Sequence, residues 1–475
     1  MVKAKIIIDD GKTQSFLAQI LTLQSAASSP LTFHQHFVAD LWWKHFHSQD
    51  GIDFGTKRGR NFFGLKNKLE YRVWIIAENA NGLCGIAPLV WNTVSIKGRA
   101  NPLMMLSFCA DSVVVFYQDL LIHPIDREDT VTAMLNTAAN YASENQGLLF
   151  LGHIPEASPN IPFLQKAMTS LLQNGWKGGW GANRFRGGVY PWTLHKLIVA
   201  LQALQEKLGE GDDRSLQIAS LIEKLEKQGS ALLGFPGTRI ALEKEVGELL
   251  QQFRDQSDFS DLMQNISLAI TGDLIKYPFI PLPKTPEEYL QSLSSSRRYY
   301  FRRYQKKFEE MGGSFENLSA DQITEKDIED YLQLHEQRWG ADSVAVNDAT
   351  LAFHRELSLA AAHAGVYRLF FARHEGKRIA AHVCFDIAGR REHFFSGRLL
   401  KAEELRAGKL LVMHTVLDAI RNGFTIYDFG YGGDEYKADF TKTWNPVLSF
   451  FLAKDESLLD LEKIFPKYEH LTLSH

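Results

Sequence analysis

The sequence predicts a mixed α/β protein built from two related units, each centred on a sheet, with a helical segment between them. One observation is a repeated order of elements: strand, helix, glycine and short strand occur at 116–154 and again at 391–430. Another is the stretch 195–270, whose apolar residues are spaced three and four apart, as in helices. The predicted division is an N-terminal unit at 1–180, a helical insertion at 181–276 and a C-terminal unit at 277–475.

The length and composition are those of a soluble globular protein. The chain has 475 residues, too many for one typical domain, and 45% of them are hydrophobic. A formal net charge of −4 argues against nucleic-acid binding by the whole surface, although a local basic patch is compatible with it. No run of about eighteen apolar residues would span a membrane. The apolar run before Asp9 is too short for a signal peptide, so we expect a cytoplasmic protein.

Neither the cysteines nor the histidines indicate a disulfide or a metal site. Cys84, Cys109 and Cys384 are far apart and lie in apolar runs, which predicts reduced core thiols. In the amphipathic helix expected at 31–50, histidines occur in pairs two residues apart, and such neighbours do not share a helix face. No carboxylate cluster completes a ligand set, so we expect no metal. The histidines concerned are His34, His36, His45 and His47.

The N-terminal unit then turns to strands. Residues 71–78, 83–91 and 112–122 are rich in β-branched and aromatic residues and are separated by turn residues. A helix follows, with Asp126 or Asp129 as its N-cap and Gly147 at its end. Another strand is expected at 148–154 and another helix at 158–175.

The helical insertion contains segments of helical spacing at 195–208, 214–228 and 241–253. A coiled-coil surface for a partner is one interpretation. Each segment is shorter than the three or four heptads that such a surface needs, so packing within the chain is favoured.

A proline-punctuated stretch at 276–290 leads into the C-terminal unit. In it, Thr285 and Glu288 form a capping box, with Pro286 at the first helical position. The following helix is strongly basic, carrying Arg297, Arg298, Arg302, Arg303, Lys306 and Lys307. Arg298 and Arg302 are four residues apart and share a helix face. The helix presents either a solvated face or a site for an anionic partner: cofactor phosphates, an acidic or nucleotide-linked sugar, or an RNA end.

The stretch 408–442 holds the clearest candidate for a phosphate site. A helix is expected to begin at Gly408 and to stop at Gly423. The unpaired N–H groups of its first turn, with Arg406 and Lys409 beside them, are a natural seat for phosphate. An ordinary helix cap is the alternative. The corresponding helix of the first unit begins with the acidic sequence HPIDRED at 123–129, where phosphate would be repelled, so only the C-terminal unit is expected to bind such a cofactor.

Several pieces in order resemble a known family: residues 294–313, 334–339, 375–397, the glycine-led helix, 427–437 and an apolar strand at 448–452. Together they resemble the GNAT superfamily of acyltransferases, specifically the CelD-like (BioF-like) acetyltransferases and their FemABX relatives. The resemblance covers residues 277–455 well and residues 30–175 more loosely. It implies two tandem GNAT-like units, of which the first is a degenerate copy that shapes the acceptor cleft and the second closes with the strand at 448–452.

The resemblance also implies the chemistry, in which an amine attacks the thioester of acetyl-CoA or another acyl-CoA without a metal. The pyrophosphate would lie against Arg406, Ala407, Gly408, Lys409, Leu410 and Leu411. A bulged or splayed strand at 391–399 would supply an N–H donor to the thioester oxygen. The family's cofactor loop has two glycines where RAGKL at 406–410 has one.

For proton transfer, the resemblance suggests Tyr436 as the acid, and the adjoining strand offers Asp428 as the base. Alternatives for the base are Glu392, His393 and Asp434. The acceptor would be held by Arg298, Arg302 and Lys437.

The leading hypothesis is a cytoplasmic acyl-CoA-dependent N-acyltransferase acting on a small-molecule amine, an amino sugar or amino acid derivative, in envelope or exopolysaccharide synthesis. One alternative is a FemABX-like transferase that moves an aminoacyl group from tRNA to a peptidoglycan precursor. Another is a non-catalytic GNAT scaffold that binds a partner through the helical insertion.

Overall fold

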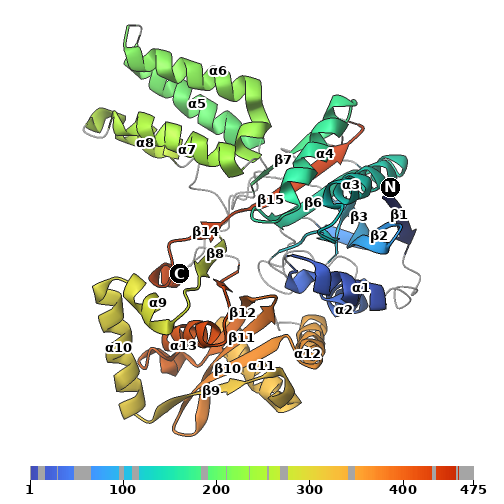
Figure 1. The fold of residues 1–475 in the computed structure, drawn as a ribbon. Coiled ribbons are helices and arrows are strands. Elements are labelled where there is room, and N and C mark those ends of the chain that lie inside the picture. The colour runs from blue at the N-terminus through green and yellow to red at the C-terminus, as the bar shows by residue number, and fades with distance from the viewer. Residues whose placement is uncertain are drawn as a thin grey trace.

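The computed structural model describes residues 2–8, 17–28, 30–47, 66–95, 101–109, 117–182, 191–209, 211–234, 236–253, 256–267, 277–340, 348–430, 435–455 and 458. Among them the chain forms two separate sheets, each flanked by helices, and a group of helices that projects beyond the first sheet (Figure 1). The predicted mixed α/β class is confirmed.

The first sheet has the strand order β1-β2-β3-β4-β6-β15-β7, and β5 pairs with β3. Its strands are β1 (Lys3–Ile8), β2 (Lys66–Asn79), β3 (Gly82–Ser95), β4 (Leu103–Phe108), β5 (Leu121–Ile122), β6 (Leu148–Pro155), β7 (Lys177–Ala182) and β15 (Val447–Ala453). Its helices are α1 (Leu17–Ala26), η2 (Thr32–His34), α2 (His36–Phe46), α3 (Arg127–Glu144) and α4 (Ile161–Gln173). The helix α3 begins after Asp126, one of the two predicted N-caps.

The second sheet has the order β14-β8-β13-β12-β11-β10-β9. Its strands are β8 (Tyr277–Pro281), β9 (Gly313–Leu318), β10 (Tyr367–His374), β11 (Lys377–Ile387), β12 (Arg390–Arg398), β13 (Ile426–Asp428) and β14 (Trp444–Asn445). Its helical elements are α9 (Pro286–Ser292), α10 (Ser295–Glu310), η5 (Ala320–Gln322), α11 (Glu325–Trp339), α12 (Asp348–His363), η7 (Leu400–Glu403), α13 (Ala407–Arg421) and η8 (Glu435–Asp439). The predicted capping box of Thr285 and Glu288 is present at the start of α9.

The two sheets follow one plan. Reading from the edges β1 and β9, antiparallel neighbours lead to one parallel pair, β4 with β6 in the first sheet and β12 with β13 in the second. In both cases a helix lies between the two strands of the parallel pair in the sequence, α3 in the first unit and α13 in the second. This correspondence agrees with the internal duplication inferred from the sequence.

The strand beyond the parallel pair comes from the C-terminal unit in both sheets, so the first sheet takes this strand from the other unit. β15 comes from the C-terminal end but lies between β6 and β7 of the first sheet, whereas β8 lies beside β13 of the second. The strand at 448–452, which the sequence analysis assigned to the C-terminal unit, therefore belongs to the first sheet. Its seven residues are all buried. A continuous apolar run predicts such burial, but it does not specify which sheet provides the neighbours.

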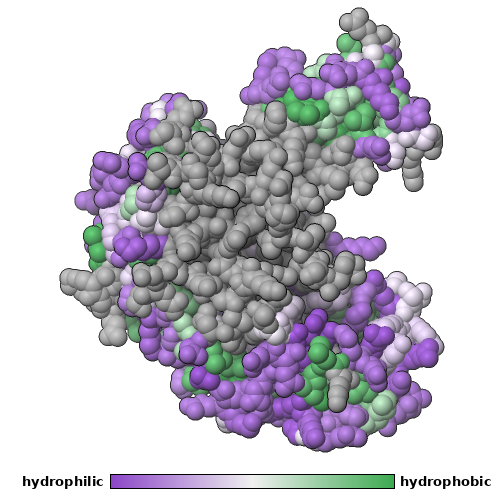
Figure 2. Space-filling model, turned by 180° about the vertical axis from the view of Figure 1, so that it is seen from behind, coloured by the Kyte–Doolittle hydropathy of each residue, from purple (hydrophilic) through white to green (hydrophobic). Residues whose placement is uncertain are grey.

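The helical insertion consists of α5 (Pro191–Leu208), α6 (Asp213–Gly234), α7 (Pro236–Gln251), η3 (Ser257–Phe259) and α8 (Ser260–Ser267). Its apolar faces form one core with one side of the first sheet; Leu201, Leu225 and Phe253 pack in the same cluster as Phe150 and Phe451. Packing within the chain, as favoured from the sequence, is confirmed. Where the rear surface consists of described residues, it is largely hydrophilic, with hydrophobic areas on the helical lobe and on the C-terminal unit (Figure 2).

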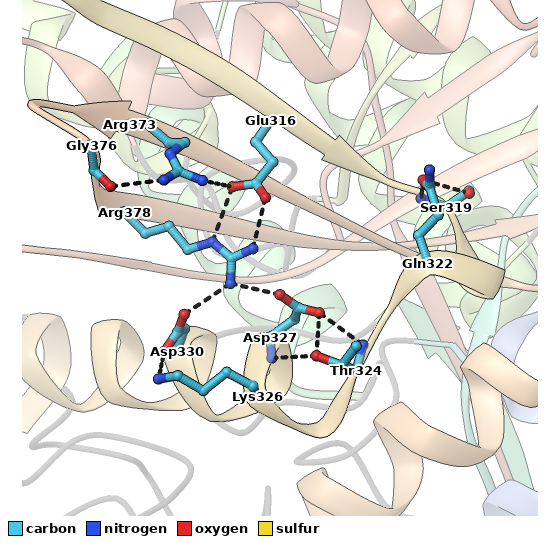
Figure 3. Close-up of polar contacts among 10 residues, drawn as sticks. All are labelled: Glu316, Ser319, Gln322, Thr324, Lys326, Asp327, Asp330, Arg373, Gly376 and Arg378. Atoms are coloured by element: carbon cyan, nitrogen blue, oxygen red, sulfur yellow. Dashed lines mark hydrogen bonds and ion pairs between the residues drawn. The ribbon is translucent and has the colours of Figure 1, made fainter.

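A charged network fastens α11 to the second sheet (Figure 3). Arg378 of β11 donates to Glu316 of β9 and also pairs with Asp327 and Asp330 of α11, at 2.7 and 2.8 Å. Arg373 adds a second ion pair to Glu316 at 3.1 Å. The network joins three neighbouring strands to the helix that covers them, and α11 in turn contacts the far part of β12.

Candidate functional site

The candidate site begins where β12 and β13 separate. Their parallel pairing covers three residue pairs and ends at Glu392 opposite Asp428, while β12 continues to Arg398. The register between β11 and β12 shifts just beyond this point, so that Phe394 is an extra residue between His393 and Phe395. The predicted bulge in this strand is confirmed. A bulge interrupts the regular ladder and re-aims the groups beside it.

The helix α13 starts beside the far end of β12. It begins at Ala407, one residue earlier than predicted, because Arg406 adopts a left-handed conformation with φ of 54° and serves as the N-cap. The amide of Leu410 already donates to the carbonyl of Arg406 at 3.1 Å. The first-turn N–H groups that lack an acceptor within the helix are thus those of Ala407, Gly408 and Lys409, not those of Leu410 and Leu411.

Several cations converge on this helix start. Lys409 and Arg297 of α10 both form ion pairs with Asp439 of η8. The Lys409 ammonium also lies 5.1 Å from the centre of the Tyr300 ring, and the Arg406 guanidinium lies 6.0 Å from that of Tyr304. Burial lowers the pKa of Lys409, and the charges of Arg297 and Arg406 lower it further. The positive potential at the α13 start is therefore shared among three side chains, partly offset by one carboxylate.

Gly408 allows close approach of a further cation. A Cβ atom at this position would lie 3.3 Å from a terminal nitrogen of Arg398 and 3.4 Å from its Cδ. The Arg398 Nε atom is buried and has no hydrogen-bond partner among the described residues. This unsatisfied donor beside a helix start fits a phosphate group chemically.

The basic helix α10 contributes to this corner through a different residue than predicted. Arg297 reaches the α13 start, whereas Arg298 donates to the carbonyls of Gln291 and Leu293 and so stabilises the end of α9. Arg302 is exposed on the outer face of α10. A role for Arg298 and Arg302 in holding an acceptor remains a prediction.

Asp428 lies at the end of the paired segment and is fully buried. Its Oδ2 accepts from the Tyr117 hydroxyl at 2.7 Å and from Arg390 at 2.9 Å, and its Oδ1 accepts from the amide of Gly430 at 2.8 Å. Burial nevertheless raises its pKa. Both carboxylate oxygens are thus occupied by donors, which suits a structural or charge-balancing role better than proton abstraction.

Glu392 faces Asp428 across the two strands and is also buried. Burial raises its pKa to about 7, against the opposing effect of Arg390 and of a hydrogen bond from the Thr32 hydroxyl to Oε2. Among the described residues, Oε1 has no hydrogen-bond partner. A buried carboxylate with a pKa near neutrality and one available oxygen has the properties of a general base.

The other predicted residues lie on the α13 side of the sheet. His393 contacts His382 with ring centres 4.7 Å apart and lies 3.4 Å from the Tyr427 hydroxyl. Burial lowers the pKa of His393 far below its ordinary value, and the charges of His382 and Lys437 contribute. Lys437 of η8 is itself buried. The structure therefore brings His393 and Lys437 together, with His393 in its neutral form at neutral pH.

Tyr436 precedes Lys437 on η8 and is half-buried. It lies close enough to Arg398 and Tyr427 to affect the pKa of both. Tyr436 thus lies near both Arg398 of β12 and Tyr427 of β13. Asp434, the remaining alternative for the base, lies outside the described residues.

The structure also adds residues that the sequence did not single out, namely Thr32 and Tyr117 of the N-terminal unit and Arg390. Arg390 directly precedes the predicted strand and lies two residues before Glu392. Because residues two apart in a strand share a face, the sequence could have indicated that Arg390 lies beside Glu392. Thr32 and Tyr117 carried no such signal, because their role depends on how the two units dock.

The histidines and cysteines elsewhere have structural environments. His34 accepts from the Leu31 amide and bonds to the carbonyl of Asp119. The three cysteines are buried and form no disulfide bond, as predicted. Within the described ranges, no three His, Cys, Asp or Glu side chains are grouped as metal ligands. In the same part of the chain, no helix has the length and apolar character needed to cross a membrane.

Comparison with protein families assigns the site-bearing segment. Residues 295–438 match the family model described as "Acetyltransferase (GNAT) domain". The match runs from the start of α10 to Ala438 and so includes the cationic helix start, both separating strands and the carboxylate pair. Over these residues, which make up less than half of the chain, the sequence is similar to a GNAT acetyltransferase domain. A comparison with curated proteins gave no match.

Solved structures of similar overall length align with the chain at low identity. The C-terminal domain of a putative lysylphosphatidylglycerol synthetase from Agrobacterium fabrum is 10% identical over 90% of this chain and 95% of that one, with a TM-score of 0.40. FemX is 10% identical over 88% and 96%, with a TM-score of 0.42. A tandem GNAT protein from the clavulanic acid biosynthesis pathway is 9% identical over 95% and 98%, with a TM-score of 0.35. Similarities this low assign no activity to this chain.

Proposed function

We propose that this chain, whose residues 295–438 are similar to a GNAT acetyltransferase domain, is an N-acyltransferase that moves an acyl group from an acyl-CoA to the amine of a small molecule. The observation that carries the proposal is a juxtaposition. β12 continues beyond the end of its pairing with β13. The buried carboxylate of Glu392, with a pKa of about 7, lies where this continuation begins, and the cationic start of α13 lies beside Arg398, where it ends.

The α13 corner would hold the diphosphate of the acyl-CoA. The amides of Ala407, Gly408 and Lys409 point out of the helix start, and Arg398 supplies an unsatisfied buried donor. When bound, an acyl-CoA supplies an activated thioester whose carbonyl carbon forms a C–N bond with the amine as its C–S bond breaks. The bulged part of β12 around Phe394 would donate an N–H to the carbonyl oxygen.

Two side chains would handle the protons. Glu392 would accept a proton from the attacking amine, since it is the carboxylate with an oxygen available. Asp428, the base suggested from the sequence, would balance the charges of Arg390 and Lys437 instead. Tyr436 is proposed as the acid that returns a proton to the departing thiolate, and Lys437 as a residue that holds the acceptor.

The acceptor proposed is an amine on a small molecule such as an amino sugar or amino acid derivative, used in envelope or exopolysaccharide synthesis in the cytoplasm. A buried carboxylate pair suits an ammonium group, which it both attracts and deprotonates. Titrating the full chain with acetyl-CoA by calorimetry tests the donor: we expect saturable binding, and heat indistinguishable from dilution would reject the assignment.

A second candidate donor is an aminoacyl-tRNA. The outer face of α10 exposes Tyr299, Arg302 and Arg303, and the Arg303 guanidinium lies 6.0 Å from the centre of the Tyr299 ring. Exposed cations interleaved with aromatic rings suit a nucleic-acid backbone. A parallel titration with charged tRNA separates the donors, because R302E with R303E should weaken tRNA binding while leaving acetyl-CoA binding intact.

A third hypothesis is that the chain is a non-catalytic scaffold. In that case Y436F would leave the biological function intact. Loss of transfer activity with retained acetyl-CoA binding in Y436F would argue against it.

A further inference from the structure

We propose that the N-terminal unit supplies two positioning residues to the transfer site, Thr32 and Tyr117, and that they act in opposite senses on the proton held by the Glu392–Asp428 pair. The assignment of Glu392 as base rests on the proposed function, whereas the proton placement can be measured without it. The unit that lacks a phosphate site would then control the acid–base chemistry of the unit that has one.

Each of the two residues touches one carboxylate across the boundary between the units. Thr32 lies on η2 and is 3% exposed, and its hydroxyl donates to Oε2 of Glu392. Tyr117 is 4% exposed, and its hydroxyl donates to Oδ2 of Asp428 at 2.7 Å. Burial holds the pKa of Tyr117 well above its ordinary value, so it remains a donor throughout the working pH range.

The two donors are held in place by one buried framework. The His34 Nδ1 atom accepts from the Leu31 amide at 3.0 Å, which leaves Nε2 as the protonated nitrogen facing the Asp119 carbonyl at 3.1 Å. This contact ties η2 to the segment 117–120 that carries Tyr117. The Asp119 carboxylate is in turn held by Ser158 and Asn160. The framework fixes Thr32 and Tyr117 relative to each other through contacts within the N-terminal unit.

The charged groups around the pair are few. Glu392 and Asp428 stand opposite each other in the parallel register. Arg390 bonds to Asp428 and lowers the pKa of both carboxyl groups, and Lys437 lowers that of Asp428. The Tyr277 ring packs against Tyr117 at 4.8 Å, and Phe385 is the neighbour of Glu392 on β11. Two adjacent buried carboxylates cannot both ionise freely, so the charge on one raises the pKa of the other.

The opposite senses follow from this coupling. The Thr32 hydroxyl stabilises ionised Glu392 directly, so its removal raises the pKa of Glu392. The Tyr117 hydroxyl stabilises ionised Asp428, and that charge disfavours ionisation of Glu392. Removing the Tyr117 hydroxyl makes Asp428 hold its proton more tightly, and the loss of its charge lowers the pKa of Glu392.

Infrared difference spectroscopy of the full chain tests this directly, because a protonated carboxyl group absorbs apart from a carboxylate. The band lost in E392Q identifies Glu392, and its intensity is followed from acid to alkaline pH. We expect T32V to move the Glu392 midpoint upward by about one pH unit, and Y117F to move it downward by about half a unit. T32S keeps the donor and should restore the wild-type midpoint.

The matched control is Y71F, which removes a tyrosine hydroxyl of the same unit that contacts Tyr141 and neither carboxylate. Shifts of T32V and Y117F in the same direction, or a midpoint unmoved in both, would overturn the proposal. If either variant fails to fold, T32A and Y117L carry the same test. Should acetyl-CoA not bind while the opposed shifts appear, the proposed function fails and the proton placement stands.

Discussion

The two units of this chain have the same backbone arrangement at their parallel strands, but the side chains at these strands differ in polarity and charge. The last paired positions are Glu392 and Asp428 in the second sheet, but Ser107 and Phe150 in the first. The helices that follow both begin after a residue in the left-handed conformation, Asp126 with φ of 62° and Arg406 with φ of 54°.

The residues after these N-caps also correspond one to one. Glu128 stands in α3 where Gly408 stands in α13, and Asp129 stands where Lys409 stands. A helix start offers the same amides in both units, but carboxylates in its first turn would repel a phosphate. The comparison shows that both helix starts have a backbone suited to a phosphate. The side chains of the first turn make this site favourable in α13 and unfavourable in α3.

The largest expected effect comes from removing the carboxylate that the first unit lacks. In E392Q, kcat/KM for acyl transfer should fall by about 100-fold to 10,000-fold, because a positioned general base contributes that much. The measurement is thiol release from acetyl-CoA in the presence of the amine acceptor. The matched change in the first unit is S107A, which should have no such effect, since the Ser107 hydroxyl accepts a hydrogen bond from Asn92 at 3.0 Å and stands where the second unit has Glu392. Equal losses in both variants would show that the two strand pairs are equivalent.

The next effect comes from giving α13 the side chain that α3 has at the same position. G408E should weaken acetyl-CoA binding by about 100-fold, because it places a carboxylate where a diphosphate is expected. Calorimetry measures the loss. G408A separates bulk from charge: its Cβ would crowd only the flexible end of Arg398, so we expect near-normal binding. A G408E chain that binds acetyl-CoA as well as the wild type would remove α13 as the phosphate seat.

The local parts of this comparison were predictable from the sequence. The contrast between HPIDRED and RAGKL was visible as charge, and the capping box of Thr285 was visible as spacing. The predicted helix start at Gly408 was one residue late because the left-handed Arg406 ends the preceding turn, and arginine gives no signal of that conformation.

The long-range parts were not predictable. An apolar run shows that β15 is buried, but its placement between β6 and β7 depends on the docking of the whole chain. For the same reason no pattern pointed to Thr32 or Tyr117, which act on residues more than 300 positions away. Sequence patterns therefore pointed to the helix start at 406–410 and to the strand that carries Glu392, whose roles in binding and proton transfer remain predictions. They gave no sign of the contacts that Thr32 and Tyr117 make with Glu392 and Asp428.

A smaller effect sharpens the contrast between the helix starts. Asp439 pairs with both Lys409 and Arg297, so it would compete with the proposed diphosphate for the same cations. D439N should therefore tighten acetyl-CoA binding by about threefold to tenfold. D129N is the control, because it removes an acid from the first turn of α3, where no cofactor is expected. Weaker binding in D439N would mean that the carboxylate instead orients the two cations for the phosphate.

The smallest effect concerns stability and the helix that covers the second sheet. R378M removes the centre of the network of Glu316, Asp327 and Asp330, and we expect it to lower the free energy of unfolding by about 2 kcal/mol at neutral pH, allowing for partial solvent exposure. In the first unit, D40N breaks the pair between Arg72 and a half-exposed carboxylate and should cost less.

The pH dependence of that difference tests its origin. A hydrogen bond from Arg378 lowers the pKa of Glu316. Burial acts to raise the pKa of Asp327, but hydrogen bonds from Thr324 and Arg378 outweigh it, so the pKa of Asp327 is lowered as well. A carboxyl group whose pKa is lower in the folded state stabilises the fold above its ordinary pKa, and this is lost as pH falls through the folded value. The gap between wild type and R378M in urea unfolding should therefore be full at pH 7 and shrink below about pH 4. A gap that stays constant into acid would assign the loss to the packing of Arg378 over Phe371, at 3.9 Å, and not to its charge.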